Sequence, residues 1–225
     1  MDLVIGAEKT HGCDPVAYLK EKKRTFVVVD KNSNSPIIKK HNLQKVDKIS
    51  GEGKFFVQGD VPKALALLEE LKPEHVFATS PVHIVAEFAK TKFKLERWDE
   101  AISPILPYLP AGLIFRVGKG ELVLSFNRDK DCIKNCEAPE VFTQEQLSKS
   151  CPVGRIRPCT MDQLMRYACP EGVILFSHSM MPGLGAFKGE EILEFFEWAK
   201  NKQKFVVGTS CNCHGVFWGF KRSEE

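Results

Sequence analysis

The feature of this sequence that most restricts its fold is a regular alternation of short apolar runs with amphipathic segments over residues 3–90. Apolar runs, several of them β-branched, predict buried strands at residues 3–7, 26–30, 55–57 and 75–79. Segments with apolar residues at helical spacing predict helices at residues 15–23, 63–71 and 82–89. Strands that alternate with helices form a parallel sheet with right-handed crossovers. The sequence therefore predicts an α/β protein with a Rossmann-like parallel sheet and crossover helices over residues 1–110.

The rest of the chain, residues 111–225, has a different pattern. Two apolar runs, Leu113–Val117 and Leu122–Phe126, flank a Gly-Lys-Gly turn and predict a β-hairpin. Residues 127–160 are polar, rich in Cys and Pro, and show little periodicity. Further strands or helices are predicted at Met161–Ala168, where Thr160 and Gln163 have capping-box spacing, and at Val173–Phe176, Glu190–Lys200 and Phe205–Gly208. We expect a Cys-rich α/β part containing a β-hairpin.

Three residues near the ends of the first two predicted strands bear on nucleotide binding. A dinucleotide site needs a tight glycine turn after the first strand and an acid at the end of the second strand for the ribose hydroxyls. Gly6 and Gly12 lie around the first turn, and Asp30 ends the second strand. This arrangement predicts that NAD or another adenine nucleotide binds at residues 1–110.

The same region resembles the nucleotide-binding domain of the RCK (regulator of potassium conductance) family. The resemblance covers roughly the first 90–110 residues and is carried by Val4–Gly6, Val28–Asn32, Val57–Val61 and Pro73–Thr79. It implies that Asp30 holds the ribose and that Gly59 and Asp60 lie beside the adenine.

One departure from that family concerns the glycine loop. The run Gly6-Ala7-Glu8-Lys9-Thr10-His11-Gly12 lacks the second glycine of the family pattern, which lets the backbone approach a pyrophosphate. Glu8 would also repel a phosphate. A sheet of the same type that binds no ligand is therefore the other interpretation of this half of the chain.

We expect no secretory signal at the start of this sequence, and eight cysteines are many for such a protein. A reducing compartment disfavours disulfides, so metal ligation, disulfides and unlinked thiols all stay open. Thiolates and imidazoles bind zinc, and thiolates hold iron–sulfur clusters. The candidate ligands are Cys132, Cys136, Cys151, Cys159, Cys211, Cys213 and His214.

A glycine-rich segment, Pro182–Glu191, lies between a predicted strand and a predicted helix. Backbone N–H groups in such a loop can cradle an anion. Glu190 and Glu191 already satisfy the dipole of the helix that follows, so a capped loop without a ligand is the simpler interpretation.

Charge and hydropathy limit the partners. The chain has 32 Lys and Arg against 29 Asp and Glu, a net charge of +3, which is unlike the basic field of a dedicated nucleic-acid binder. No apolar run approaches the roughly 20 residues of a membrane span. We expect a cytoplasmic protein with a small-molecule nucleotide as its partner, without nucleic acid or a membrane span; a homodimer stays open.

These features predict a nucleotide-binding regulatory or binding protein that also carries a Cys-rich metal or cluster site. One alternative is an NAD(P)-dependent or thiol- or metal-dependent redox enzyme, in which Cys211, Cys213 and His214 serve the chemistry. The second alternative is an interaction scaffold without a ligand.

Overall fold

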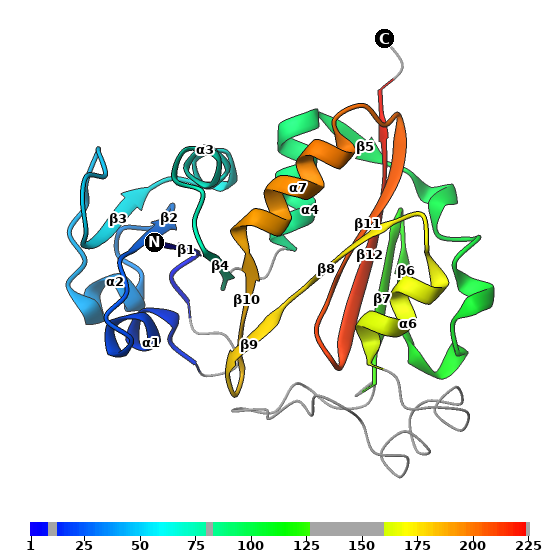
Figure 1. Cartoon of the computed structure of the whole chain (residues 1–225), viewed down its shortest axis with the longest axis horizontal. Coiled ribbons are helices and arrows are strands. Elements are labelled where there is room, and N and C mark those ends of the chain that lie inside the picture. Colours follow the sequence, from blue (N-terminus) through cyan, green and yellow to red (C-terminus); the bar gives the residue numbers. More distant parts are fainter. Residues whose placement is uncertain (9–12, 80–82, 127–159, 224–225) are drawn as a thin grey trace.

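The computed structural model describes residues 1–8, 13–79, 83–126 and 160–223 (Figure 1). Its first half is built from four parallel strands with the spatial order β3-β2-β1-β4. Their bounds are Asp2–Ile5 (β1), Phe26–Asp30 (β2), Lys54–Gln58 (β3) and His75–Ala78 (β4). The helices of this half are Pro15–Glu21 (α1), Pro36–His41 (α2), Val61–Leu71 (α3) and Ile84–Phe93 (α4). The alternation predicted from the sequence is thus confirmed for these four strands.

The first sheet does not end with β4. Strand β10 (Leu184–Lys188) pairs antiparallel with β4, and β9 (His178–Met181) pairs antiparallel with β10. Two strands from near the end of the chain therefore complete a sheet begun at its start. The sheet is mixed, so the prediction of a parallel sheet is correct only for its first four strands.

The glycine-rich segment that was expected to be a loop forms a hairpin. Gly183 has φ +80°, a left-handed conformation that glycine adopts without strain, and it turns β9 into β10. Gly185 and its neighbours then lie within β10 rather than in a strand-to-helix loop. The anion-cradle interpretation is wrong for these residues, because their N–H groups belong to a strand of the sheet.

A second, mixed sheet has the order β6-β7-β12-β11-β8, with the short strand β5 also paired to β12. The strands are Leu95–Arg97 (β5), Ile114–Gly118 (β6), Glu121–Ser125 (β7), Val173–Phe176 (β8), Lys204–Ser210 (β11) and His214–Arg222 (β12). The helices of this half are Asp99–Ala101 (η1), Leu106–Tyr108 (η2), Ala111–Leu113 (η3), Met161–Ala168 (α6) and Gly189–Ala199 (α7). The predicted β-hairpin is confirmed as β6 and β7, and the predicted capping box is confirmed at the start of α6.

The two sheets are joined through one continuous stretch of chain. Only Ser177 separates β8, in the second sheet, from β9, in the first. Helices α4 and α7 lie between the sheets, as Figure 1 shows. One apolar core includes Ile5 and Val27 from the first sheet, Phe88 and Phe195 from these helices, and Trp218 from the second sheet. No single position in the sequence therefore divides the chain into the two sheets. None of the helices in the described ranges is both long and apolar enough to cross a bilayer.

Candidate functional site

A tight turn joins β11 to β12 at the lower end of the second sheet in Figure 1. The main-chain N–H of Cys211 donates to the carbonyl of His214 at 2.9 Å, which closes the turn. In the opposite direction, the main-chain N–H of His214 donates to Cys211 Sγ at 3.3 Å. The turn thus brings together three of the sequence-predicted residues, Cys211, Cys213 and His214.

The Cys211 sulfur is surrounded by groups that favour its charged form. The neighbouring Cys213 side chain lowers the pKa of Cys211 most. Burial acts in the opposite direction, and His214, whose Nδ1 lies 3.7 Å from Sγ, lowers the pKa further. The net result is a Cys211 pKa well below its ordinary value. The thiolate is the nucleophilic and metal-binding form of cysteine, and the lowered pKa of Cys211 favours that form.

The two cysteines of the turn, Cys211 and Cys213, differ in solvent exposure. Cys211 is half-buried, whereas only 3% of Cys213 is exposed. Two other described cysteines, Cys13 and Cys169, are also buried, and burial raises the pKa of Cys169. Cys211 is therefore the most exposed of the described cysteines, and its pKa is lowered whereas that of Cys169 is raised.

Both residues that border the cysteine-rich segment are hydrogen-bonded to this turn. The N–H of Phe126, just after β7, donates to the carbonyl of Cys213 at 2.9 Å. The N–H of Met161, the first residue of α6, donates to the carbonyl of Asn212 at 3.0 Å. The described residues on both sides of that stretch of sequence therefore contact the turn. The predicted ligands Cys132, Cys136, Cys151 and Cys159 lie outside the described residues.

Cys211 and His214 are spaced as two ligands of one metal ion would be. A tetrahedral Zn²⁺ with its usual bond lengths places a sulfur and a nitrogen ligand roughly 3.6 Å apart. The observed distance between Cys211 Sγ and His214 Nδ1 is 3.7 Å. Cys213 does not complete a set of three, because within the described ranges only Asp2, Glu74 and His75 form a group whose ligand atoms all lie within 4.8 Å of one another.

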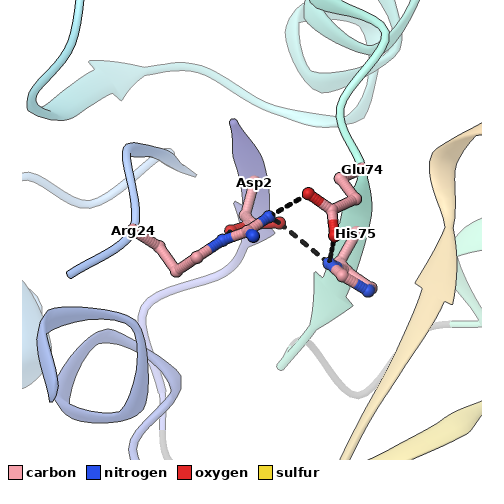
Figure 2. Close-up of polar contacts among 4 residues, drawn as sticks. All are labelled: Asp2, Arg24, Glu74 and His75. Carbon is pink, nitrogen blue, oxygen red and sulfur yellow. Dashed lines mark hydrogen bonds and ion pairs between the residues drawn. The ribbon is translucent and has the colours of Figure 1, made fainter. Parts of the chain in front are cut away.

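Figure 2 shows the group of Asp2, Glu74 and His75 together with Arg24, whose guanidinium supplies a positive charge there. Asp2 is fully buried, and its carboxylate accepts hydrogen bonds from Arg24 Nε at 2.8 Å and Arg24 Nη2 at 3.0 Å. His75 Nδ1 lies 3.0 Å from the same carboxylate, and Glu74 forms an ion pair with Arg24. The guanidinium lowers the pKa of Glu74. Since Arg24 forms ion pairs with both acids, we interpret the cluster as a structural charge network. This cluster was not predicted from the sequence, although Asp2, a carboxylate at the start of an apolar strand, indicates a buried charge that needs a partner.

The residues predicted to bind a nucleotide meet where the parallel strands end. Gly6 has φ +85° in the turn after β1, and the N–H of Gly59 donates to the carbonyl of Asp30 at 3.1 Å. The Asp30 carboxylate, however, accepts hydrogen bonds of 2.6 Å from the N–H groups of Ala7 and Asn32. Asp30 therefore links the turn after β1, through Ala7, to the turn after β2, through Asn32.

The structure describes only one of the other two residues predicted to bind a nucleotide, Asp60 and Gly12. Asp60 stands at the N-cap position of α3, is exposed and makes no side-chain cap hydrogen bond. Gly12 lies outside the described residues. At the same edge, the Cys13 thiol donates to the carbonyl of Pro182 at 3.1 Å, so the tip of the β9–β10 hairpin reaches the start of the first crossover.

The fold and the turn define a two-sheet α/β protein with a cysteine and a histidine side chain held together at the end of one sheet. The chain belongs to the AF_1314 family, since the model of its C-terminal domain, described as "Uncharacterized protein, C-terminal domain", matches residues 83–223. The N-terminal domain model of the family matches residues 1–84. A protein of Archaeoglobus fulgidus, described as an uncharacterized protein, is 36% identical over 226 residues, covering 99% of this chain and 100% of the relative. No solved structure matches. The resemblance to the RCK family stays a prediction.

Proposed function

We propose that the chain is a thiol-dependent redox protein whose reactive group is the Cys211 thiolate. The observation that carries this proposal is the set of donors around one sulfur. Cys211 Sγ accepts a hydrogen bond from the main-chain N–H of His214 and lies 3.7 Å from His214 Nδ1, and the neighbouring Cys213 side chain lowers the pKa of Cys211. Donors of this kind lower the energy of a thiolate, and a thiolate at neutral pH is the nucleophile of thiol chemistry.

Each residue of the turn has a distinct role in this proposal. Cys211 attacks the substrate, because it is the half-buried sulfur and carries the lowered pKa. His214 stabilises the thiolate through its main chain and its ring. The hydrogen bonds from Phe126 and Met161 hold the backbone of the turn, so the sulfur needs no rearrangement before it reacts.

The test is the rate of alkylation of each cysteine as a function of pH. The reduced protein is pulsed with iodoacetamide, and the labelled peptides are quantified by mass spectrometry. Cys211 should react at pH values where an ordinary thiol, with a pKa of about 8.5, is still protonated. Cys169, whose pKa burial raises, serves as the internal comparison. A pH profile for Cys211 centred at or above that of an ordinary thiol contradicts the proposal.

A second candidate function is the binding of zinc or an iron–sulfur cluster, and the contacts of Phe126 and Met161 with the turn favour it. Phe126 and Met161, which border residues 127–160 in the sequence, both donate hydrogen bonds to the turn. The predicted ligands Cys132, Cys136, Cys151 and Cys159 belong to that stretch of sequence. The chemistry of these ligands fits, since the lowered pKa of Cys211 favours the metal-binding thiolate and His214 Nδ1 lies 3.7 Å from Cys211 Sγ. A bound ion would polarise its ligands or carry electrons, and Cys211 and His214 would hold it.

Elemental analysis and a UV–visible spectrum of anaerobically purified protein test this candidate. Stoichiometric zinc, or iron with a charge-transfer band, should be lost in Cys211→Ser and His214→Ala and retained in Cys13→Ser. Cys13 is the matched control because its thiol bonds to Pro182, at the edge of the other sheet. Metal-free, colourless wild-type protein contradicts the candidate.

Nucleotide binding by a Rossmann-like first sheet also remains a prediction. The strand order β3-β2-β1-β4 and the positive φ of Gly6 support it. The use of both Asp30 oxygens by the main chain weighs against it.

A further inference from the structure

We infer that the N-terminus of α4, together with Arg97 and Trp218 of the second sheet, binds a phosphate group. Three kinds of N–H donor come together at this place without an acceptor among the described residues. They are the main chain of the first turn of α4, the indole of Trp218 and the guanidinium of Arg97. Helix α4 lies between the two sheets (Figure 1), so residues of both halves of the chain form the site. The inference does not depend on the chemistry proposed for the β11–β12 turn.

The first turn of α4 is buried. Ile84, Val85 and Ala86 are 2%, 0% and 2% exposed. The hydrogen bond of 3.1 Å from the N–H of Glu87 to the carbonyl of His83 opens the helix, and His83, at the N-cap, makes no side-chain cap hydrogen bond. In the described ranges no group accepts from the three N–H groups that precede Glu87. Since a buried helix start needs acceptors and its dipole favours a negative charge, this turn is suited to an anion.

Trp218, on β12, supplies an independent observation. The residue is only 7% exposed, and its indole Nε1 is buried without a hydrogen-bond partner among the described residues. Its ring lies beside the start of α4, because the ring centroids of Trp218 and His83, the N-cap residue, are 5.5 Å apart. Tryptophan N–H groups that are buried usually have a partner. An acceptor bound at the start of α4 would give the indole that partner.

Arg97, on β5, brings a positive charge to the same indole. Its guanidinium carbon lies 3.5 Å from the centroid of the Trp218 ring, so the ring covers one face of the guanidinium and leaves the N–H groups at its edge. Glu121 and Glu87 attract Arg97 from a distance, and no described carboxylate forms an ion pair with it. Glu121 is instead bonded to Arg116 at 2.6 Å. The partly buried charge of Arg97 therefore lacks a direct counter-ion, which an anionic ligand would provide.

The number and placement of the donors favour phosphate over a carboxylate. The helix contributes its N–H groups from one side, and Arg97 and Trp218 contribute theirs from the second sheet. A carboxylate has two oxygens in one plane, whereas a phosphate has oxygens on several sides and can accept from both groups of donors. Helix N-termini and arginine are the usual phosphate ligands in proteins. Free phosphate and the phosphate of a larger molecule share this chemistry, and the experiment separates them.

The experiment follows the indole N–H of Trp218 in ¹H–¹⁵N correlation spectra of the full-length protein. The chain has three tryptophans, and the signal that disappears in Trp218→Phe is that of Trp218. Potassium phosphate, AMP and potassium chloride are titrated separately at constant ionic strength. The Trp218 signal should shift to saturation with phosphate or AMP and should not shift with chloride. Saturation at a lower concentration of AMP than of phosphate identifies a phosphorylated molecule as the ligand, and the reverse order identifies the free ion.

Isothermal titration calorimetry with the tighter of the two probes measures what each donor contributes. Arg97→Met retains an apolar stem over Trp218 and removes the guanidinium, and Trp218→Phe retains a ring and removes the N–H. Each variant should weaken binding by about tenfold or more, the usual effect of losing a hydrogen bond to a charged group. Lys119→Met, at an exposed cation in the β6–β7 turn, and Trp198→Phe, on α7, are the matched controls and should bind as wild type does.

Three results would overturn the inference. The first is a Trp218 signal that does not shift with either probe, and the second is an equal shift with chloride. The third is equal affinity in wild type, Arg97→Met and Trp218→Phe, because the anion is then held elsewhere. If these two variants do not fold, as judged by circular dichroism, the spectra of wild type decide. The Trp218 signal is then assigned by elimination with Trp98→Phe and Trp198→Phe, and its shift with phosphate or AMP, or the lack of one, gives the answer.

Discussion

The carboxylate of Asp30, at the end of β2, accepts a hydrogen bond of 2.6 Å from the main-chain N–H of Ala7, in the turn after β1. In dinucleotide-binding sheets the N–H groups that follow the first strand face a phosphate, and the acid at the end of the second strand binds the ribose. Here the two groups bind each other. A nucleotide would have to displace this bond or bind beside it.

The nucleotide prediction is tested by a thermal-shift panel with NAD, NADH, NADP, ATP and AMP. If a nucleotide binds at the edge of the first sheet, saturating ligand should raise the melting temperature by mass action. Asp30→Ala should abolish that rise, and Asp47→Ala, a change at an exposed acid, should leave it intact. A rise that survives in Asp30→Ala places the site elsewhere, and no rise with any nucleotide rejects the prediction.

Asp14 gives a prediction about stability and pH. It caps α1 by accepting the N–H of Ala17 at 3.0 Å, and its other oxygen binds Lys40 and His41 at 2.7 and 2.8 Å. Burial raises the pKa of Asp14, but these hydrogen bonds outweigh it and lower the pKa from 3.8 to about 2. The stabilising contribution is therefore fully present above pH 3.8 and is lost as the pH falls toward 2.

Urea unfolding of wild type, Asp14→Ala and Asp14→Asn at a series of pH values measures this contribution. At neutral pH, Asp14→Ala should lower the free energy of unfolding by about 1–2 kcal/mol, because it removes the cap and the ion pairs. Asp14→Asn retains a capping side chain and should lose less. The difference between wild type and Asp14→Asn should shrink below pH 3.8. A difference that is constant with pH would show that the charge of Asp14 contributes nothing.

Arg24 is expected to be essential for the stability of the first sheet. Replacing it with Met leaves the fully buried Asp2 carboxylate without its guanidinium partner, which should cost about 3 kcal/mol. The double variant Asp2→Asn/Arg24→Met should recover most of that loss, since the buried charge is gone. Chemical denaturation of the single and double variants checks this. Equal destabilisation in both would mean that Arg24 acts through packing rather than through charge.

Gly189 tests the connection between the two parts of the fold. It begins α7 and donates its N–H to the carbonyl of Glu74 at 3.0 Å, and a Cβ there would lie 1.9 Å from the carbonyl oxygen of Pro73. Because the obstacle is backbone, Gly189→Ala should lower the free energy of unfolding by about 2 kcal/mol or more. Gly112→Ala is the matched control, since nothing lies within 4 Å of its added Cβ. If both variants unfold alike, the close approach of α7 to Pro73 does not contribute to stability.

Local sequence signals predicted the individual elements well. Apolar runs such as Phe26–Asp30 became strands, and Thr160 with Gln163 formed the expected capping box. These features depend on residues a few positions apart, which sequence patterns report directly. The hairpin at Gly183 was missed, because its two strands contain polar and glycine residues and no alternating apolar pattern.

Sequence alone determined that Cys211, Cys213 and His214 stand together, because neighbours in the chain are neighbours in space. It also determined four short strands with helices between them. Only the tertiary structure decided that β10 joins β4, that Phe126 and Met161 both reach the thiol turn, and that Asp30 binds Ala7. The partners in these contacts are far apart in the sequence. Their pairing depends on how the whole chain buries its apolar surface and satisfies its backbone groups, which no local pattern encodes.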